Sequence, residues 1–144
     1  MIVVLVLLGV TMGLFLGFNF RQMESLRLRA AGRDMYQFLR GARSAAMIED
    51  MPNVCLYYPQ NATLGEGLRR RQMALPPGVR ILLEEEPEDD TAPLALTTFY
   101  PDGTAVMNTI VLGVKERRLA VTVRPILGQV IIEAHPDDDE DQKS

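Results

Sequence analysis

The sequence predicts an α+β protein in which one long N-terminal helix packs on an antiparallel β-sheet domain. Two observations predict this fold. No charged residue occurs from Met1 to Phe20, and this apolar run continues directly into an amphipathic segment that stops at Pro52. After Pro52, short runs rich in Val, Ile, Leu and Tyr alternate with turn residues, as in strands joined by tight connections. The length of 144 residues allows this helix and one small domain.

This pattern divides the chain into four segments. Residues 1–20 form the apolar half of the helix and residues 21–51 its amphipathic half. Residues 52–134 form the β-rich domain, and residues 135–144 are expected to be an acidic, disordered tail.

The apolar half is long enough to enter a membrane. The first eighteen residues carry no charge and span about 27 Å as a helix, close to the thickness of a hydrocarbon core. A cleaved secretory signal is the competing interpretation, but there is no basic segment before the run and no small-x-small site after it. Gly9, Gly13 and Gly17 recur every four residues and predict a membrane or helix-packing ridge.

The amphipathic half shows the spacing of a helix that packs on one side only. Arg33, Arg40 and Arg43 fall on the side expected to face solvent. Pro52 should end the helix, because the residue before a proline is driven out of helical geometry. A continuous helix to Asp50 would be about 75 Å long. The expected contacts between helix and domain are made by apolar or small residues three and four apart: Leu28, Ala31, Met35, Phe38, Ala42 and Ala45.

The domain is expected to contain one or two antiparallel sheets with mostly sequential pairing. The turn residues in Pro101–Gly103 and Pro125–Gly128 suit hairpin connections. Gln60–Gly78 and the acidic Glu85–Pro93 are expected to be loops. The predicted strands are Asn53–Tyr58, Val79–Glu84, Leu96–Tyr100, Ala105–Leu112, Leu119–Arg124 and Gln129–Glu133.

Charge and residue usage argue against most catalytic chemistry. The net charge is −4, and the excess of acidic residues lies after Pro52. The single cysteine, Cys55, lies between Val54 and Leu56 and is expected to be a small buried hydrophobic residue. The acidic runs Glu84–Asp90 and Asp137–Asp141 lack the glycine-punctuated spacing of a calcium loop, so we assign no metal site. We expect no catalytic residue, no cofactor and no enzymatic activity.

Arg69, Arg70 and Arg71 form a compact basic cluster. This cluster is a weak candidate for contact with phosphate, a lipid headgroup or an acidic neighbour. A solvated loop is the competing interpretation, because three charges bind an anion weakly and lose that binding as salt rises. The acidic balance of the chain makes nucleic acid an unlikely partner.

The chain resembles the minor pilins and pseudopilins of the GspH/FimT type. The resemblance covers the apolar start Met1–Gly9, the helix Leu28–Ala46, the turn motif Phe99-Tyr100-Pro101-Asp102-Gly103 and the closing hairpin Leu119–Ile132 with Gly128. It implies a pilin-like fold and a minor pseudopilin function: a structural subunit of a type II secretion pseudopilus involved in protein secretion across the outer membrane. The alternative within the family is a FimT-type minor type IV pilin, involved in pilus assembly or DNA uptake.

The resemblance also implies partners and a location. The expected partners are other pseudopilins or pilins through the N-terminal helix, the inner-membrane assembly platform and secreted substrate. The helix would cross the inner membrane once, with the C-terminal domain in the periplasm. In contrast, Arg21, Arg27, Arg29 and Arg33 would by the positive-inside rule keep the domain in the cytoplasm. The family's basic leader, prepilin peptidase site, glutamate and N-terminal methylation would need a segment upstream of Met1.

Two functions outside this role remain alternatives. A DNA receptor would use Arg69–Arg71 together with Arg117 and Arg118. A membrane-anchored periplasmic enzyme would need a pocket with perturbed titratable groups, which no motif in the sequence indicates.

Overall fold

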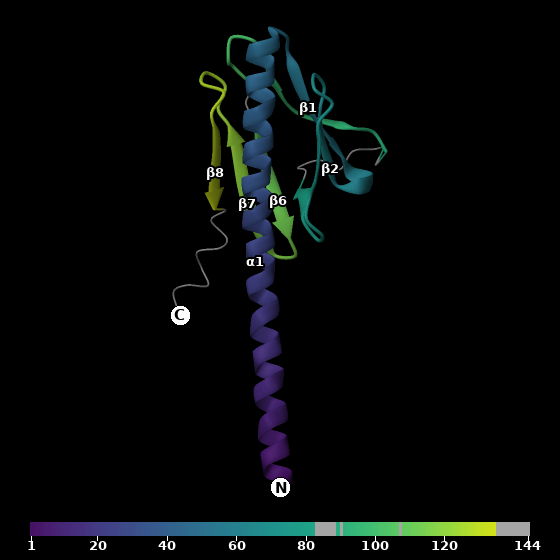
Figure 1. Ribbon diagram of the computed structural model, residues 1–144, viewed down its shortest axis with the longest axis vertical. Coiled ribbons are helices and arrows are strands. Elements are labelled where there is room, and N and C mark those ends of the chain that lie inside the picture. Colours follow the sequence, from purple (N-terminus) through teal and green to yellow (C-terminus); the bar gives the residue numbers. More distant parts are fainter. Residues whose placement is uncertain (83–88, 90, 107, 135–144) are drawn as a thin grey trace.

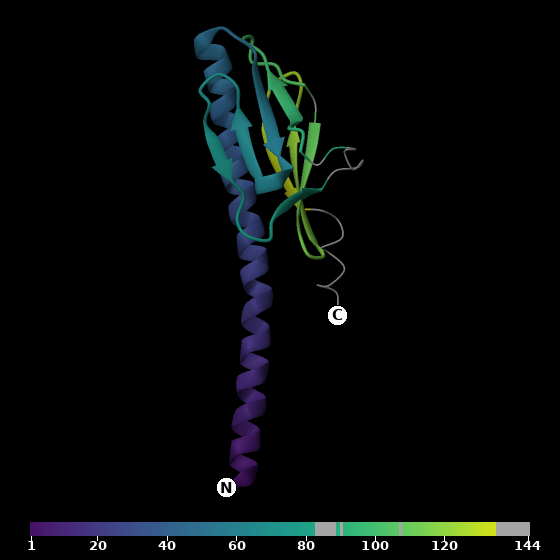
Figure 2. The same cartoon turned by 90° about the vertical axis from the view of Figure 1, so that its right-hand side faces the viewer.

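The computed structural model describes residues 1–82, 89, 91–106 and 108–134 (Figure 1). The helix α1 (Ile2–Glu49) runs the full length of the molecule, and the β-domain packs along its C-terminal half (Figures 1 and 2). Asp50 adopts a left-handed conformation with φ of 53° and donates its N–H to the Ala46 carbonyl. Pro52 follows two residues later, so the predicted continuous helix and its end are confirmed.

The domain is built from two four-stranded antiparallel sheets. The first sheet has the order β3-β2-β1-β5 and the second the order β4-β6-β7-β8. A short 3₁₀ helix, Pro59–Asn61, separates β1 from β2. The strands are β1 (Asn53–Tyr58), β2 (Thr63–Glu66), β3 (Gln72–Ala74), β4 (Arg80–Leu82), β5 (Leu94–Phe99), β6 (Asn108–Val114), β7 (Arg117–Val123) and β8 (Val130–Ala134).

Sequential pairing holds within each sheet but fails where the chain passes from one sheet to the other. β1, β2 and β3 pair in order, as do β6, β7 and β8. β5 instead pairs with β1, with Asn53 opposite Phe99, and the next strand, β6, belongs to the second sheet. The Pro101–Gly103 turn therefore joins the two sheets, with one isolated bridge between Phe99 and Ala105 beside it.

The hydrophobic core fills the space between α1 and the two sheets. The helix contacts β1 and β5 of the first sheet and β6, β7 and β8 of the second. Figure 2 shows the helix on one side and the strands on the other. Burial of this apolar surface is the main force that holds the helix on the domain. The largest fully buried apolar side chains are Phe99, Met35, Leu39, Leu64, Leu112, Val79, Val121 and Val123.

The prediction that Gln60–Gly78 is one long loop is wrong, because β2 and β3 lie within it. The segment contains glycines, prolines and three consecutive arginines, which favour a loop. Its two strands are only four and three residues long, so neither shows a clear alternation of apolar and polar residues. Pairing with the neighbouring β1 outweighs these local preferences.

Other expected strand ends differ from the observed ones by a few residues. β4 begins at Arg80 rather than Val79, and β6 begins at Asn108 rather than Ala105. The end of the predicted strand Val79–Glu84 lies outside the described residues, as do most of the acidic run Glu84–Asp90 and the whole of residues 135–144.

Candidate assembly interface

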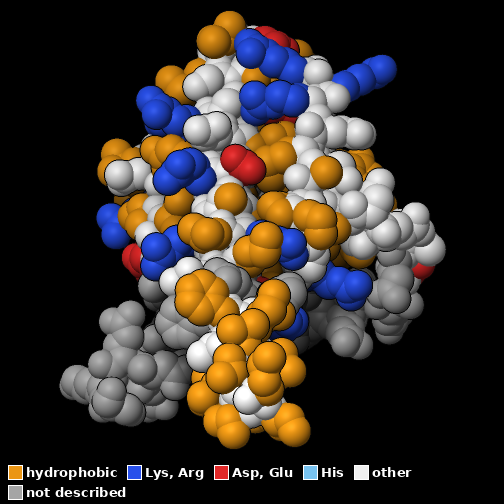
Figure 3. Space-filling view, turned by 60° about the horizontal axis from the view of Figure 1, so that its bottom comes forward, with side chains coloured by type: hydrophobic (Ala, Val, Ile, Leu, Met, Phe, Trp, Pro, Cys, Tyr) orange, Lys and Arg blue, Asp and Glu red, His pale blue; other side chains and the backbone are white. Residues whose placement is uncertain are grey.

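The N-terminal half of α1 projects from the domain as an apolar stalk. Its bulky apolar side chains from Ile2 to Leu16 are 54–79% exposed. An 18-residue window of α1 has a mean hydropathy of 2.4 with none of it buried, so this helix is long and apolar enough to cross a membrane by length and composition. Figure 3 shows the apolar stalk below the more polar domain. Exposed apolar surface of this extent marks a membrane or protein contact.

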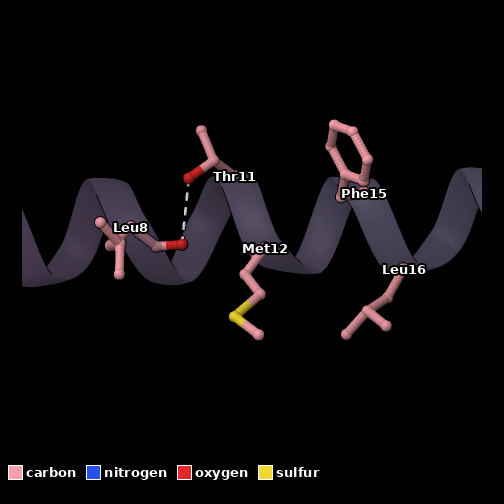
Figure 4. A pocket seen from close by; sticks show the side chains of 5 residues that line it. All are labelled: Leu8, Thr11, Met12, Phe15 and Leu16. Atoms are coloured by element: carbon pink, nitrogen blue, oxygen red, sulfur yellow. Dashed lines mark hydrogen bonds between the residues drawn. The ribbon is translucent and has the colours of Figure 1, made fainter.

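One flank of the stalk is a shallow apolar groove (Figure 4). Met12 and Leu16 point to one side of the helix, and Thr11 and Phe15 point to the other; Leu8 completes the lining. The Thr11 hydroxyl donates to the carbonyls of Leu7 and Leu8, at 2.7 and 3.0 Å. The hydroxyl, which is the only polar side-chain group among these five residues, is therefore hydrogen-bonded within the helix. This face can then enter an apolar environment at little cost in free energy.

The predicted packing ridge lies on this stalk. A Cβ atom built on Gly9, Gly13 or Gly17 would meet no other atom within 4 Å. Within the single chain the glycines therefore serve no close contact, and their packing role remains a prediction. Glycine is costly in a helix, by about 1 kcal/mol relative to alanine, so an external contact would explain three of them in one row.

The six residues expected to contact the domain are all buried, with 0–4% of each exposed: Leu28, Ala31, Met35, Phe38, Ala42 and Ala45. Leu39 and Ala46 extend this stripe. Helix and sheet approach closely at Gly32, since a Cβ built there would lie 2.4 Å from Leu119 Cδ2 of β7 and 3.9 Å from Ile132 Cγ2 of β8.

The turn motif Phe99-Tyr100-Pro101-Asp102-Gly103 lies at the end of the domain farthest from the N-terminus. Phe99 is fully buried, while Asp102 accepts hydrogen bonds from the N–H and hydroxyl of Thr104 at 3.0 and 2.6 Å. These bonds lower the pKa of Asp102. Gly103 has φ of 85°, which favours glycine, and its N–H donates to the Tyr100 carbonyl.

Arg43 connects this turn to the helix, although the sequence pattern placed Arg43 on the solvated side. Its Nε donates to the Gly103 carbonyl oxygen at 3.1 Å. The β7–β8 turn lies on the same spot, because a Cβ built on Gly128 would be 2.3 Å from Gly103 O and 2.6 Å from Arg43 Nε. The side chain is half-buried between two turns that are far apart in sequence, so helical periodicity alone could not reveal it.

A buried polar network lies under the helix where β1 meets β2. Asn53 is fully buried and donates from Nδ2 to the Ala42 carbonyl (3.0 Å) and to Glu66 Oε2 (3.3 Å), while its Oδ1 accepts the Leu68 N–H (3.2 Å). Glu66 Oε1 is buried and accepts no hydrogen bond from the described residues, but Arg71 Nε lies 3.6 Å away as an ion pair. The sequence interpretation missed this network.

The arginine cluster is divided among different contacts. Arg69 forms an ion pair with Glu49 at 2.9 Å. Arg71 turns back onto α1, where it donates to the Phe38 carbonyl at 3.0 Å and covers the Phe38 ring at 5.1 Å. Arg70 is exposed and makes no ion pair in the described part of the chain. The geometry therefore does not present three free arginines as one anion contact.

Cys55 is fully buried next to this network, opposite Glu66 in the β1–β2 register, as expected for a small hydrophobic residue. Burial raises the pKa of the Cys55 thiol to about 12, with a further increase from the Glu66 carboxylate and a smaller opposing effect of Arg71. The thiol therefore stays protonated and unreactive at neutral pH.

The fold is shared with a known secretion protein. No family model matches the sequence, and no curated protein sequence matches it either. The structure is similar to that of the minor pseudopilin EpsH from the Type 2 Secretion System of Vibrio cholerae, with a TM-score of 0.54 and 14% sequence identity. The match covers 75% of this chain and 97% of that one. With its long N-terminal helix and antiparallel β-domain, the chain shares the pilin-like α+β fold of that protein.

Proposed function

We propose that the chain is a minor pseudopilin, a structural subunit of a type II secretion pseudopilus that takes part in protein secretion across the outer membrane. The observation that supports this proposal most is the exposed apolar half of α1, which projects from a domain of the pseudopilin fold. A filament subunit needs an apolar surface that can be stored in the membrane and then buried in the filament, and this stalk provides one.

The stalk serves both purposes because lipid and helix bundles offer the same apolar environment. In the inner membrane, the helix satisfies its own backbone hydrogen bonds and exposes only apolar side chains to lipid. In the filament, the stalks of neighbouring pseudopilins replace the lipid, and Gly9, Gly13 and Gly17 permit close helix contacts. The domain stays in the periplasm, where its loops meet the assembly platform and secreted substrate.

A FimT-type minor pilin is the alternative within the same fold. The fold supports both roles equally, and neither secreted substrate nor pilus type can be chosen from it. The DNA-uptake role is weakened because Arg69 and Arg71 are already engaged by Glu49 and by α1.

The experiment that distinguishes these roles measures into which type of filament the chain is incorporated. The full chain, tagged after residue 144, is produced in bacteria that carry either a type II secretion system or a type IV pilus machinery. Filaments are sheared from the cells, purified and probed for the tag. Incorporation into secretion filaments, together with reduced secretion when the chain is deleted, is the expected result.

Incorporation into type IV pili alone would replace the proposal with its alternative. A chain that stays in the inner membrane in both strains, with secretion unchanged by its deletion, would contradict the assembly role altogether.

A further inference from the structure

Four exposed arginines lie on the two elements beside the end of β8. Arg29 and Arg33 lie on α1, and Arg117 and Arg118 begin β7. We call these four residues the basic collar. In the part of the chain that the structure describes, none of them forms an ion pair. Figure 3 shows basic side chains around the place where the apolar stalk leaves the domain.

The contacts of Gly32 fix how the collar is arranged. Gly32 lies between Arg29 and Arg33 in α1, and a Cβ built on it would lie 2.4 Å from Leu119 Cδ2 of β7 and 3.9 Å from Ile132 Cγ2 of β8. Leu119 is also the register partner of Ala134, the last residue of β8. The end of β8 therefore lies beside α1 at the level of the collar. Arg117 lies on the same face of β7 as Leu119, towards α1, and Arg118 lies on the opposite face.

The chain that follows Ala134 carries the opposite charge. Residues Asp137–Asp141 are five consecutive acidic residues. An extended chain advances about 3.3 Å per residue, so Asp137 lies within about 10 Å of Ala134 whatever path the chain takes. We propose that the basic collar is the docking surface for this chain's own acidic segment, Asp137–Asp141.

Charge and tethering together favour this occupant. A short tether keeps the segment at an effective concentration in the millimolar range, so weak contacts suffice to hold it. Each exposed ion pair is weak on its own, and the contact must disappear as the Debye length falls from about 30 Å at 0.01 M salt to about 3 Å at 1 M. The docked segment shields the collar from other polyanions at the end of the domain nearest the stalk. This proposal does not depend on the assembly role.

The test measures the distance between the helix and the acidic segment in the full chain. Spin labels are attached to Ala30→Cys on α1 and Gln142→Cys after the acidic run, in a neutral detergent. Cys55 can stay in place because its buried thiol does not react. Electron–electron distance measurements should give a short and narrow distribution of the distance between the two labels at about 0.01 M salt. This distribution should broaden at about 1 M salt.

Matched charge variants make the result specific to the collar. The collar variant carries Arg29→Gln, Arg33→Gln, Arg117→Gln and Arg118→Gln, and should lose the short distance even at low salt. The control variant removes the same number of charges at exposed arginines elsewhere, by Arg40→Gln, Arg70→Gln, Arg80→Gln and Arg124→Gln, and should keep it.

Two results would overturn the proposal. One is a distance distribution that is the same in the collar variant and the unmodified chain. The other is loss of the short distance when labelled chain is diluted with excess unlabelled chain. That loss would show that the acidic segment binds the collar of a second copy and not its own. A second measurement uses phosphatidylglycerol vesicles as the competing polyanion. The unmodified chain should bind these vesicles more weakly than a variant in which residues 137–141 are changed to Asn and Gln.

Discussion

At the scale of single residues, the helix is attached to the domain by polar side chains as well as by the apolar core. Arg43 reaches the Gly103 carbonyl across sixty positions of sequence, and Arg71 reaches the Phe38 carbonyl across thirty-three. Asn53 does the same from the start of β1 to the Ala42 carbonyl. These contacts fix the rotation of the helix on the sheets, which the apolar stripe alone would allow to shift.

Replacing Arg43→Ala should destabilise the domain by about 1–2 kcal/mol. The change removes the hydrogen bond to Gly103 O and leaves a space beside the two turns that Arg43 contacts. Urea unfolding of the full chain in mild detergent can be followed by the near-ultraviolet signal of its four tyrosines. The control, Arg40→Ala, removes an exposed arginine one turn away and should stay within about 0.5 kcal/mol of the unmodified chain.

Removing Arg71 should cost about 1–3 kcal/mol, because the Glu66 carboxylate would lose its charged neighbour. The Glu66 side chain is fully buried, while that of Arg71 is 47% exposed, so the effect comes mainly from Glu66. Arg71→Met combined with Glu66→Gln should recover part of the loss, since an amide carries no charge to bury. If the double variant is less stable than Arg71→Met alone, the carboxylate is not the source of the loss. Arg70→Met is the matched control.

The raised pKa of Cys55 predicts how the stability of the domain changes at alkaline pH. Its pKa is raised from 9.0 to about 12 by folding, so the unfolded chain loses the thiol proton first. The contribution of Cys55 to stability is present below pH 9 and is lost as the pH rises from 9 towards 12. A thiol reagent at pH 8 should modify Cys55 only after urea unfolds the domain. Modification of the native chain at the rate of a free thiol would show that the thiol is not buried.

At the scale of elements, one helix carries two different surfaces. The C-terminal half buries a stripe against both sheets, whereas the bulky apolar side chains from Ile2 to Leu16 are exposed on the stalk. Glycines mark the difference. Gly32 lies where side chains of β7 and β8 approach α1 closely, while a Cβ built on Gly13 would meet nothing within 4 Å.

Replacing Gly32→Leu should therefore destabilise the domain by about 1–3 kcal/mol, because the added side chain must displace Leu119 and push the helix from the sheet. Gly13→Leu provides the matched control in the same helix. It should leave the unfolding of the domain unchanged, since nothing lies within 4 Å of the added Cβ. Equal effects of the two changes on urea unfolding would contradict the division of α1 into two surfaces.

The elements that could be predicted from sequence are those whose own pattern is strong. The apolar run and the stripe from Leu28 to Ala45 define α1, Pro52 sets its end, and Asn53–Tyr58 matches β1 at both ends. β2 and β3 could not be predicted, because their stability comes from pairing with β1 and not from their own residues. Contacts such as Asn53 with Glu66 depend on that unpredicted pairing.

At the scale of the whole molecule, a folded domain is joined to a stalk whose apolar surface is unfavourable in water. The apolar side chains from Ile2 to Leu16 gain free energy when they leave water, by about 25 cal/mol for each Å² buried. A membrane and a bundle of similar helices are the two environments that offer this burial. Assembly through this helix therefore requires that the stalk contacts other helices once it has left the lipid.

Cysteine cross-linking along the stalk tests this central claim most directly. Single cysteines are placed at each position from Leu5 to Gly17 of the full chain. Each variant is produced together with pseudopilins of a type II secretion system that carry one cysteine in their own N-terminal helices, and the isolated membranes are oxidised so that two neighbouring thiols form a disulfide. We predict cross-links to these pseudopilins whose yield repeats about every 3.6 residues along the helix, with maxima at Gly9, Gly13 and Gly17. A chain that forms no cross-link at any position, or the same yield at every position, would contradict assembly through this helix.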